Sequence, residues 1–228
     1  RAHNTASQSR MRCRSKLDRM HEFDVVVIGA GAAGLFCAGV AGQSGLKVLL
    51  VDHTDKIAEK IRISGGGRCN FTNLNTGASN FLGENPKFCR SALAGYRPGD
   101  FIDLLRRHHI GYHEKHKGQL FCDRSAQDLI TMLLTECAAG GVTHWQNCPI
   151  HTVATEGAEP HYLLGSGQGT IRSRAVVIAT GGLSIPKIGA TDFGYRIARQ
   201  FGLSVIAPRP ALVPLTFDPA QWAPFAEL

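Results

Sequence analysis

Three glycines near the start of the chain have the spacing of a phosphate-binding turn. The first of them, Gly29, ends the apolar run Asp24–Gly29, and Gly31 and Gly34 follow it. The β-branched composition of this run is typical of a buried parallel strand. In such a G-x-G-x-x-G turn the first glycine permits a tight bend and the second lets the backbone approach a pyrophosphate. The third allows a helix to pack closely on the strand. The spacing therefore predicts a dinucleotide site.

The elements after the turn support this interpretation. We predict a helix to about Ser44 with Gly45 as its C-terminal cap, followed by a second buried strand, Lys47–Val51, that ends at Asp52. A carboxylate at this position can accept hydrogen bonds from a ribose diol, which favours an adenosine without a 2′-phosphate. The alternative is a glycine-rich turn that binds nothing. The order of strand, helix, strand and acid favours the dinucleotide site.

A second glycine-rich stretch, Ser64–Asn73, predicts a loop that faces a ligand. Three consecutive glycines allow a backbone to lie flat against a bound molecule, and Arg68, Cys69 and Asn70 follow them directly. The alternative is a flexible surface loop. Cys69 is either a reactive thiol or a small residue that fits a tight loop, and we favour the second reading.

The rest of the chain predicts an α/β fold with a parallel sheet, helices on both faces and a small antiparallel meander. Ser125–Asp128 is a capping-box pattern that opens a helix ending at Gly140, and Val142–Gln146 extends the parallel sheet. The other predicted elements are a loop over Asn75–Gly99, a helix over Asp100–His109, a hairpin over Tyr112–Cys122, meander strands at Ile150–Val153, His161–Leu164 and Thr170–Arg172, a buried strand at Ala175–Ala179, and a helix from Thr191 to Gly202.

Composition and charge argue against several partners. Six basic residues and one acid in residues 1–19 account for +5 of the net charge of +7, which leaves +2 for the rest, so we expect no nucleic-acid partner. We interpret residues 1–19 as a disordered leader or tag. No apolar run approaches the roughly 18 residues that span a membrane. Seven cysteines without a C-x-x-C pair favour reduced thiols and a cytoplasmic location.

Four histidines at positions 108, 109, 113 and 116, together with Glu114, raise the possibility of a metal site. Two or three of them at most could converge on one ion, and no cysteine pair joins them at zinc spacing. We therefore predict no metal and expect solvent-facing histidines around a helix end and a hairpin.

Three ordered motifs carry a resemblance to a known family: VVIGAGAAGL near the start, SGGGRCNFTN and the late ATGGLSIPKIGATDFGY, with GQLFCDRSAQD between the last two. From about Met20 onward the chain resembles the BaiN/YhiN-like family of bacterial NAD(P)/FAD-dependent flavoproteins, which includes aminoacetone oxidases and a bile-acid dehydro-reductase. Family members continue for well over a hundred residues more, so the chain resembles an N-terminal fragment.

The resemblance implies a glutathione-reductase-like, Rossmann-type FAD domain and a set of cofactor contacts. The family more often has Glu where this chain has Asp52. The implied contacts are the pyrophosphate at Gly29, Ala30, Gly31, Ala32, Ala33, Gly34, Thr180 and Gly181, the ribose at Asp52, the adenine at Ile150, a family lysine at Lys60, and the flavin beside Ser64, Gly65, Gly66, Gly67, Arg68, Cys69 and Asn70.

By the same resemblance we expect an FAD-dependent oxidoreductase that transfers a hydride to or from a small organic substrate, with NAD(P)H or oxygen as the other partner. An RNA-modifying flavoprotein similar to the tRNA-methylating enzymes and a non-catalytic dinucleotide-binding module are the alternatives. Arg68 would either place positive charge near the flavin or hold its loop through a salt bridge. Catalytic residues and oligomeric state are not assigned. The expected domains are the FAD domain at 20–212, with an excursion at 64–124, and the start of a substrate domain at 213–228.

Overall fold

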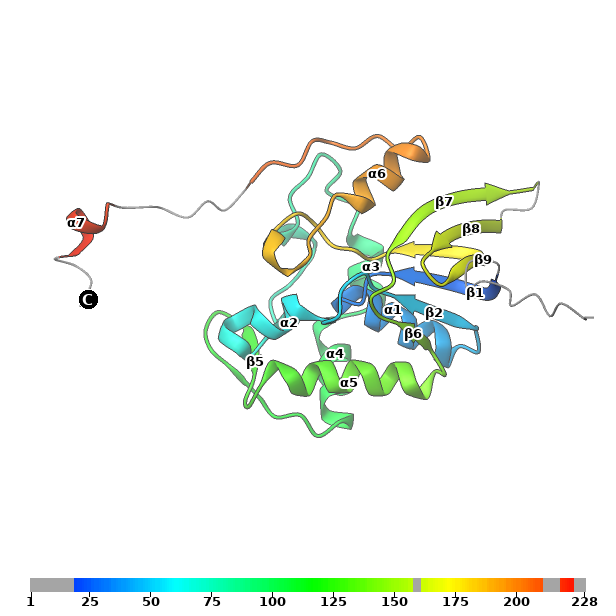
Figure 1. Cartoon of the computed structure of the whole chain (residues 1–228). Coiled ribbons are helices and arrows are strands. Elements are labelled where there is room, and N and C mark those ends of the chain that lie inside the picture. Colours follow the sequence, from blue (N-terminus) through cyan, green and yellow to red (C-terminus); the bar gives the residue numbers. More distant parts are fainter. Residues whose placement is uncertain (1–18, 158–160, 211–217, 224–228) are drawn as a thin grey trace, which may run out of the picture. The chain divides into compact units, whose positions relative to one another are not determined.

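Strand β1, Met20–Ile28, lies inside a six-stranded sheet in the computed structural model (Figure 1). The structure describes residues 19–157, 161–210 and 218–223. The strand order of the sheet is β6-β2-β1-β9-β8-β7. The apolar run predicts β1 from Asp24, but the observed strand begins at Met20 because its first residues pair with β9.

The sheet is parallel around β1 and antiparallel at one edge. β1 pairs in parallel with β2, Val48–Val51, and β2 pairs in parallel with β6, Thr143–Trp145, so the predicted extension of the parallel sheet is confirmed. On its other side β1 pairs in parallel with β9, Gly169–Ile178. β9 continues into an antiparallel meander with β8, His161–Ser166, and β7, Ile150–Glu156, as the sequence predicts.

Strand β9 corrects one detail of the prediction. It joins Thr170–Arg172 and Ala175–Ala179, which the sequence suggests as separate strands, because the register with β1 continues from one segment into the other. The sequence predicts that the second segment is buried, but Ile178 in it is 37% exposed. Apolar composition predicts a strand but does not say which of its faces is covered.

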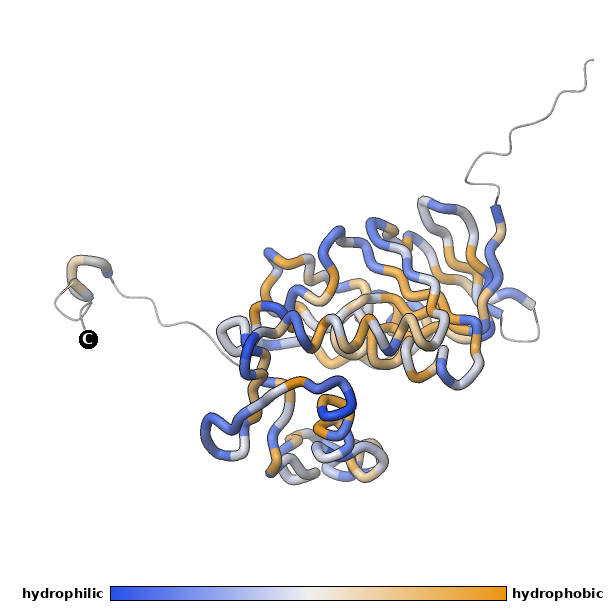
Figure 2. Tube along the Cα trace, turned by 90° about the horizontal axis from the view of Figure 1, so that it is seen from below, coloured by the Kyte–Doolittle hydropathy of each residue, from blue (hydrophilic) through white to orange (hydrophobic). Residues whose placement is uncertain are grey.

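Helices α1, Ala32–Gln43, and α5, Ala126–Ala139, pack together on one face of the sheet (Figure 1). Ser125 caps α5 as predicted, because its Oγ accepts a hydrogen bond from the Gln127 amide at 3.1 Å. The reciprocal bond of a capping box is replaced by an ion pair of Asp128 with Arg124. Figure 2 shows hydrophobic residues concentrated in this layer of strands and helices and hydrophilic residues in many of the loops. Buried side chains of the layer include Val27, Val48, Leu50, Leu35, Leu129, Ile130 and Leu133.

The excursion between α1–β2 and α5 contains more regular structure than predicted. The hairpin is confirmed, with β4, Tyr112–Glu114, pairing antiparallel with β5, Gln119–Cys122, and Lys117 and Gly118 at positive φ in its turn. α2, Glu59–Ile63, directly precedes the excursion at 64–124. The other elements of the excursion are a 3₁₀ turn Ser64–Gly67, β3 Asn70–Asn73 paired with β5, a 3₁₀ turn Ala78–Asn80, α3 Arg90–Gly95 and α4 Pro98–Arg107.

Two loop predictions within this excursion were wrong in part. Asn75–Gly99 is not a continuous loop, because it holds α3 and the first two residues of α4. Ser64–Asn73 is not a loop throughout, since Asn70–Asn73 pairs with β5, and its contact with a ligand stays a prediction. Both elements are short and have too few residues for a clear periodic pattern.

Two compact units divide the described part of the chain, one ending at Gly194 and the other beginning at Tyr195. The C-terminal elements are a 3₁₀ turn Pro186–Ile188, α6 Phe193–Gln200 and α7 Pro219–Trp222. The predicted leader at 1–19, apart from its last residue, lies outside the described residues. So does most of the expected start of a second domain at 213–228.

Several negative findings apply to the described residues. No helix there is long and apolar enough to cross a membrane. Within the same residues no three metal-ligating side chains come together. His113 instead pairs with Asp123 at 2.8 Å, and Glu114 accepts a hydrogen bond from the Gly118 amide. Six cysteines in this part of the chain are free thiols: Cys37, Cys69, Cys89, Cys122, Cys137 and Cys148.

Helices α1 and α5 meet backbone to backbone near their C-terminal ends. A Cβ atom on Gly42 would lie 2.5 Å from the carbonyl oxygen of Gly140, and one on Gly140 would lie 2.8 Å from the amide nitrogen of Gln43. The two helices can therefore approach this closely only with glycine at both positions.

We predict that Gly42→Ala destabilises the protein by about 1–3 kcal/mol, because the added methyl group forces the helices apart. Urea unfolding followed by circular dichroism measures the change. Gly95→Ala is the matched control, since no atom lies within 4 Å of a Cβ at that helical position. Equal stability of the two variants would contradict the backbone contact.

Glu136 joins three helices through its carboxylate. Oε2 accepts a hydrogen bond from Gln43 Nε2 of α1 at 2.9 Å, and Oε1 lies 2.6 Å from Nε2 of His108, the C-terminal cap of α4. These contacts, the Gln43 hydrogen bond first and His108 second, lower the pKa of Glu136 below its usual value. The ionised form is therefore more stable in the folded than in the unfolded protein.

We predict that Glu136→Gln costs about 1 kcal/mol of stability at pH 7. Because the folded pKa is depressed, this contribution is present above the unfolded pKa of Glu and is lost as pH falls through the folded value. Unfolding free energies at neutral and acidic pH test this, and the gap to wild type should close in acid. Asp103→Asn, at an exposed ion pair with Arg106, should show no such gap.

Candidate functional site

The turn after β1 is shaped by two glycines that the fold itself requires. Gly29 has a φ of +106°, and a Cβ there would lie 2.6 Å from the carbonyl oxygen of Ala179 at the end of β9. Its amide donates to the carbonyl of Val51 at 2.8 Å. A Cβ on Gly34, in the first turn of α1, would overlap the carbonyl oxygen of Gly29. These contacts agree with the tight bend and the close helix packing expected of the first and third glycines.

Gly31 differs because the protein gives no reason for a glycine there. Its φ is −83°, which any residue adopts, and no atom lies within 4 Å of the position that an added Cβ would take. The open space lies at the N-terminus of α1, where Gly31 is the N-cap residue. A side chain would fill the position that a close-approaching diphosphate needs. The turn therefore fits the diphosphate of a dinucleotide such as FAD.

The N-terminus of α1 presents a partial positive charge. No side chain caps it and its first turn carries no acidic residue. The first backbone N–H groups of a helix have no partner within the helix, and the helix dipole adds about half a positive charge at this end. Ala32 and Ala33 are exposed here. This end of α1 can therefore bind an anionic group.

Asp52 connects the end of β2 to the turn. Its Oδ2 accepts a hydrogen bond from the Ala30 amide at 2.7 Å, and its Oδ1 accepts from the amide and the hydroxyl of Thr54 at 2.8 and 2.7 Å. A carboxylate has about four lone-pair sites, so one remains for a further donor. The carboxylate lies at the glycine turn, and its predicted ribose contact stays a prediction.

Ala30 is more constrained than the sequence suggests. It is fully buried, its amide binds Asp52, and its carbonyl accepts a hydrogen bond from the Ala58 amide at 3.1 Å. The second bond places the segment before α2 beside the turn. Sequence reasoning missed both Thr54 and Ala58. An Asp followed two residues later by Thr is an Asx-turn pattern, which could have indicated Thr54.

The predicted adenine side of the site also lies near Asp52. The Asp52 amide donates to the carbonyl of Trp145, and the Cys148 amide donates to the carbonyl of Asp52, both at 2.9 Å. Ile150, two residues later, is buried at the start of β7. The structure thus brings the segment before Ile150 to the end of β2.

The end of β9 completes this edge of the sheet. The Ala179 amide donates to the carbonyl of Ile28 at 2.8 Å, so Thr180 and Gly181 follow directly beside the turn. Gly181 has a φ of +73° and open space around a Cβ position. Lys60, on α2, donates from Nζ to the hydroxyl of Ser184 at 2.9 Å. The ends of β1, β2 and β9 and the start of α2 therefore meet at one edge.

The Ser64–Asn70 loop is a compact turn that continues from α2. Gly65, Gly66 and Gly67 all have positive φ, and a Cβ on Gly65 would lie 2.7 Å from the ring of Phe121. Gly66 has open space instead. The chain therefore needs glycine here for its own folding, whether or not a ligand lies against it.

Cys69 and Arg68 differ in exposure. Cys69 is buried, and burial raises the pKa of its thiol, which keeps it protonated and favours the reading as a small residue in a tight loop. Arg68 is exposed, and its guanidinium forms no ion pair with any residue that the structure describes. The salt bridge considered for Arg68 is thus absent from that part of the chain.

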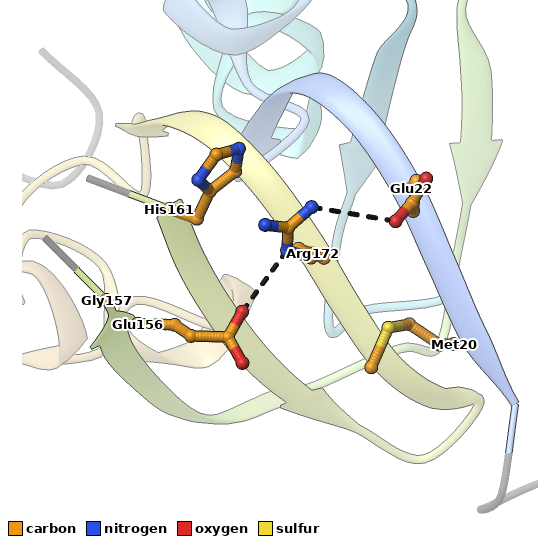
Figure 3. Close-up of a pocket in the computed structure, with 6 residues that line it drawn as sticks. All are labelled: Met20, Glu22, Glu156, Gly157, His161 and Arg172. Carbon is orange, nitrogen blue, oxygen red and sulfur yellow. Dashed lines mark hydrogen bonds and ion pairs between the residues drawn. The ribbon is translucent and has the colours of Figure 1, made fainter. Parts of the chain in front are cut away.

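A shallow pocket lies elsewhere in the fold (Figure 3). It has a volume of about 510 Å³ and is lined by Met20, Glu22, Glu156, Gly157, His161 and Arg172. Arg172 lies between Glu22 and Glu156, at 3.7 and 3.2 Å, so its charge is already paired. Because Met20 and Glu22 are at the start of β1, this pocket is at the strand end opposite the glycine turn, and we assign the site to the turn.

The sequence profile of the HI0933-like protein Rossmann domain matches residues 23–211. The chain belongs to this family. Its fold is the Rossmann-type FAD-binding α/β fold, with a mostly parallel sheet and a small antiparallel one. A 3-ketosteroid dehydrogenase from Rhodococcus jostii has a similar fold, with a TM-score of 0.53 and 16% identity over 72% of this chain and 46% of that one. The structure of Thermovibrio ammonificans THI4 has a TM-score of 0.50 and 14% identity, over 80% of this chain and 64% of that one.

Curated relatives show higher identity. The ribosomal RNA dihydrouridine synthase of Escherichia coli is 51% identical over 86% of this chain and 49% of its own length. The Haemophilus influenzae protein of the same name is 44% identical over 84% of this chain and 48% of its own length. A 3-dehydro-bile acid delta(4,6)-reductase from Clostridium scindens is 29% identical over 83% of this chain and 46% of its own length. The chain spans about half the length of the curated relatives that it matches.

We predict that Gly31→Val weakens FAD binding at least tenfold, or about 1.4 kcal/mol, while the fold stays intact. The added side chain occupies the space at the N-terminus of α1, where no protein atom would clash with its Cβ. Calorimetric titration with FAD measures binding, and circular dichroism measures folding. Gly99→Val, also in open space, is the control. Unchanged FAD uptake by Gly31→Val would show that the pyrophosphate lies elsewhere.

Proposed function

We propose that this chain is the FAD-binding part of a reductase that adds hydrogen to the double bond of a uracil ring in ribosomal RNA. The observation that carries the proposal is the 51% identity to a ribosomal RNA dihydrouridine synthase over 86% of the chain. The matched region includes most of the described fold. The glycine turn with an open position at Gly31 supports FAD as the cofactor.

The residues at the sheet edge have distinct roles in this proposal. The uncapped N-terminus of α1 balances the charge of the diphosphate, and Gly31 leaves the room for it. Asp52 holds the turn through Ala30 and offers its remaining lone pair to a ribose hydroxyl. The hydrogen bond from Lys60 to Ser184 connects α2 to the segment after β9. Arg68 supplies an exposed positive charge on the glycine-rich loop.

The chemistry is a two-electron reduction. When bound at the glycine turn, FAD would supply the hydride chemistry that links NAD(P)H to the uracil ring, whose reduction adds a hydride at carbon 6 and a proton at carbon 5. The carbon-carbon double bond is conjugated with a ring carbonyl, which takes up the developing negative charge. This chain's residues bind and orient the cofactor. We propose a cytoplasmic location, where ribosomal RNA is found.

A small organic substrate is the second candidate, and one observation favours it. The bile acid reductase relative, 29% identical, is named for reducing double bonds conjugated with a 3-oxo group. This supports the BaiN/YhiN-like resemblance and the same type of reduction on a different molecule. Because the relatives named for RNA modification have the higher identity, RNA is our first candidate.

We predict that disrupting the gene for this protein removes a dihydrouridine from the ribosomal RNA of the organism that carries it. Nuclease digestion followed by mass spectrometry measures the nucleoside. Reintroducing the intact gene should restore it, and a gene with Gly31→Val should not. An unchanged dihydrouridine content would overturn the RNA proposal. Loss of reduction of a conjugated ketone in the same cells would instead favour the second candidate.

A further inference from the structure

The segment Phe81–Arg97, which we call the 81–97 segment, exposes large apolar side chains. Every residue from Phe81 to Phe88 is exposed. Phe88 is 85% exposed, Leu82 96% and Phe81 48%. Large exposed apolar side chains gathered in one short segment are a feature of surfaces that bind a partner.

The same segment is basic. Lys87, Arg90 and Arg97 are exposed, and Glu84 is the one acidic residue among residues 81–97. Among the residues that the structure describes, none forms an ion pair with these three cations. The whole excursion at 64–124 holds nine basic and five acidic residues, a net of +4. Since residues 20–228 carry +2 in total, the remainder carries −2, and the positive charge is concentrated in the excursion.

An aromatic contact anchors this segment close to the cofactor turn. The ring of Tyr96 packs edge-on against Phe36, with 5.1 Å between the ring centroids. Phe36 is on α1, five residues after Gly31, and also contacts Phe101 of α4. The C-terminal end of the 81–97 segment is therefore fixed beside the first turns of α1, on the helix whose N-terminus forms the candidate site.

We propose that the 81–97 segment binds single-stranded RNA next to the target uridine. Phe88 and Phe81 stack on bases, while Lys87, Arg90 and Arg97 contact phosphates. The proposal rests on the proposed function. A base must leave its stack before an enzyme can act on its ring. Phe88 lies between Lys87 and Arg90 in the sequence. Exposed aromatic rings next to basic side chains can hold unstacked bases and their backbone.

The test measures binding of the whole protein encoded by the gene to a fluorescent oligouridylate by anisotropy. We expect Phe88→Ala to weaken binding about tenfold, because one stacking interaction is removed. Phe88→Tyr should retain binding, since the ring stays. Leu82→Ala, the more exposed but non-aromatic neighbour, should bind as the wild type does.

The charge part of the proposal has its own readout. Lys87→Gln with Arg90→Gln should lower the slope of log affinity against log salt by roughly 0.7 for each phosphate that the variant no longer neutralises. Arg174→Gln on β9, whose side chain is 74% exposed, is the control and should leave the slope unchanged.

The outcomes separate this surface from the proposed function. Flavin absorbance and the rate of flavin reduction by NADPH should be the same in all these variants. RNA binding that is equal in Phe88→Ala and wild type would overturn the surface, even if dihydrouridine is made. A lower melting temperature in both Phe88→Ala and Leu82→Ala, with unchanged RNA affinity, would show that protein covers the segment. Loss of dihydrouridine in the Gly31→Val strain, together with wild-type RNA affinity of Phe88→Ala, would support the proposed function and overturn the surface.

Discussion

The hydrogen bond from the Ala30 amide to the Asp52 carboxylate determines the geometry of the candidate site. It ties the turn after β1 to the end of β2. Thr54 holds the other carboxylate oxygen, so the side chain cannot rotate away without losing two further bonds. On the β9 side of the turn, the carbonyl of Ala179 lies so close to Gly29 that no side chain fits there. The turn is therefore fixed between two strands, and the start of α1 follows from its position.

The sequence predicts the parts of this site whose causes are local. Glycine spacing, an apolar run and a terminal acid indicate the turn, the helix and Asp52 because each depends on neighbouring residues alone. The hairpin at Lys117 and Gly118 is predicted for the same reason, since its turn requires positive φ.

The missed features depend on contacts between distant residues. α3 is a six-residue helix with a weak pattern of its own, and Tyr96 at its end packs on Phe36. β9 is one strand because of its partner β1, which its composition cannot reveal. The second bond of Ala30, to Ala58, joins residues 28 positions apart. Net charge is similarly a sum over the chain and conceals how unevenly the charge is distributed.

The glycine contact between α1 and α5 has a consequence for ligand affinity. Because Gly42 and Gly140 meet through their backbones, α1 cannot slide along α5 without a clash, and its opposite end is held at a constant height above the sheet. A diphosphate bound there, as we propose, would meet amides that are already aligned. Little ordering entropy is then lost on binding, so more of the gross interaction energy is available as affinity.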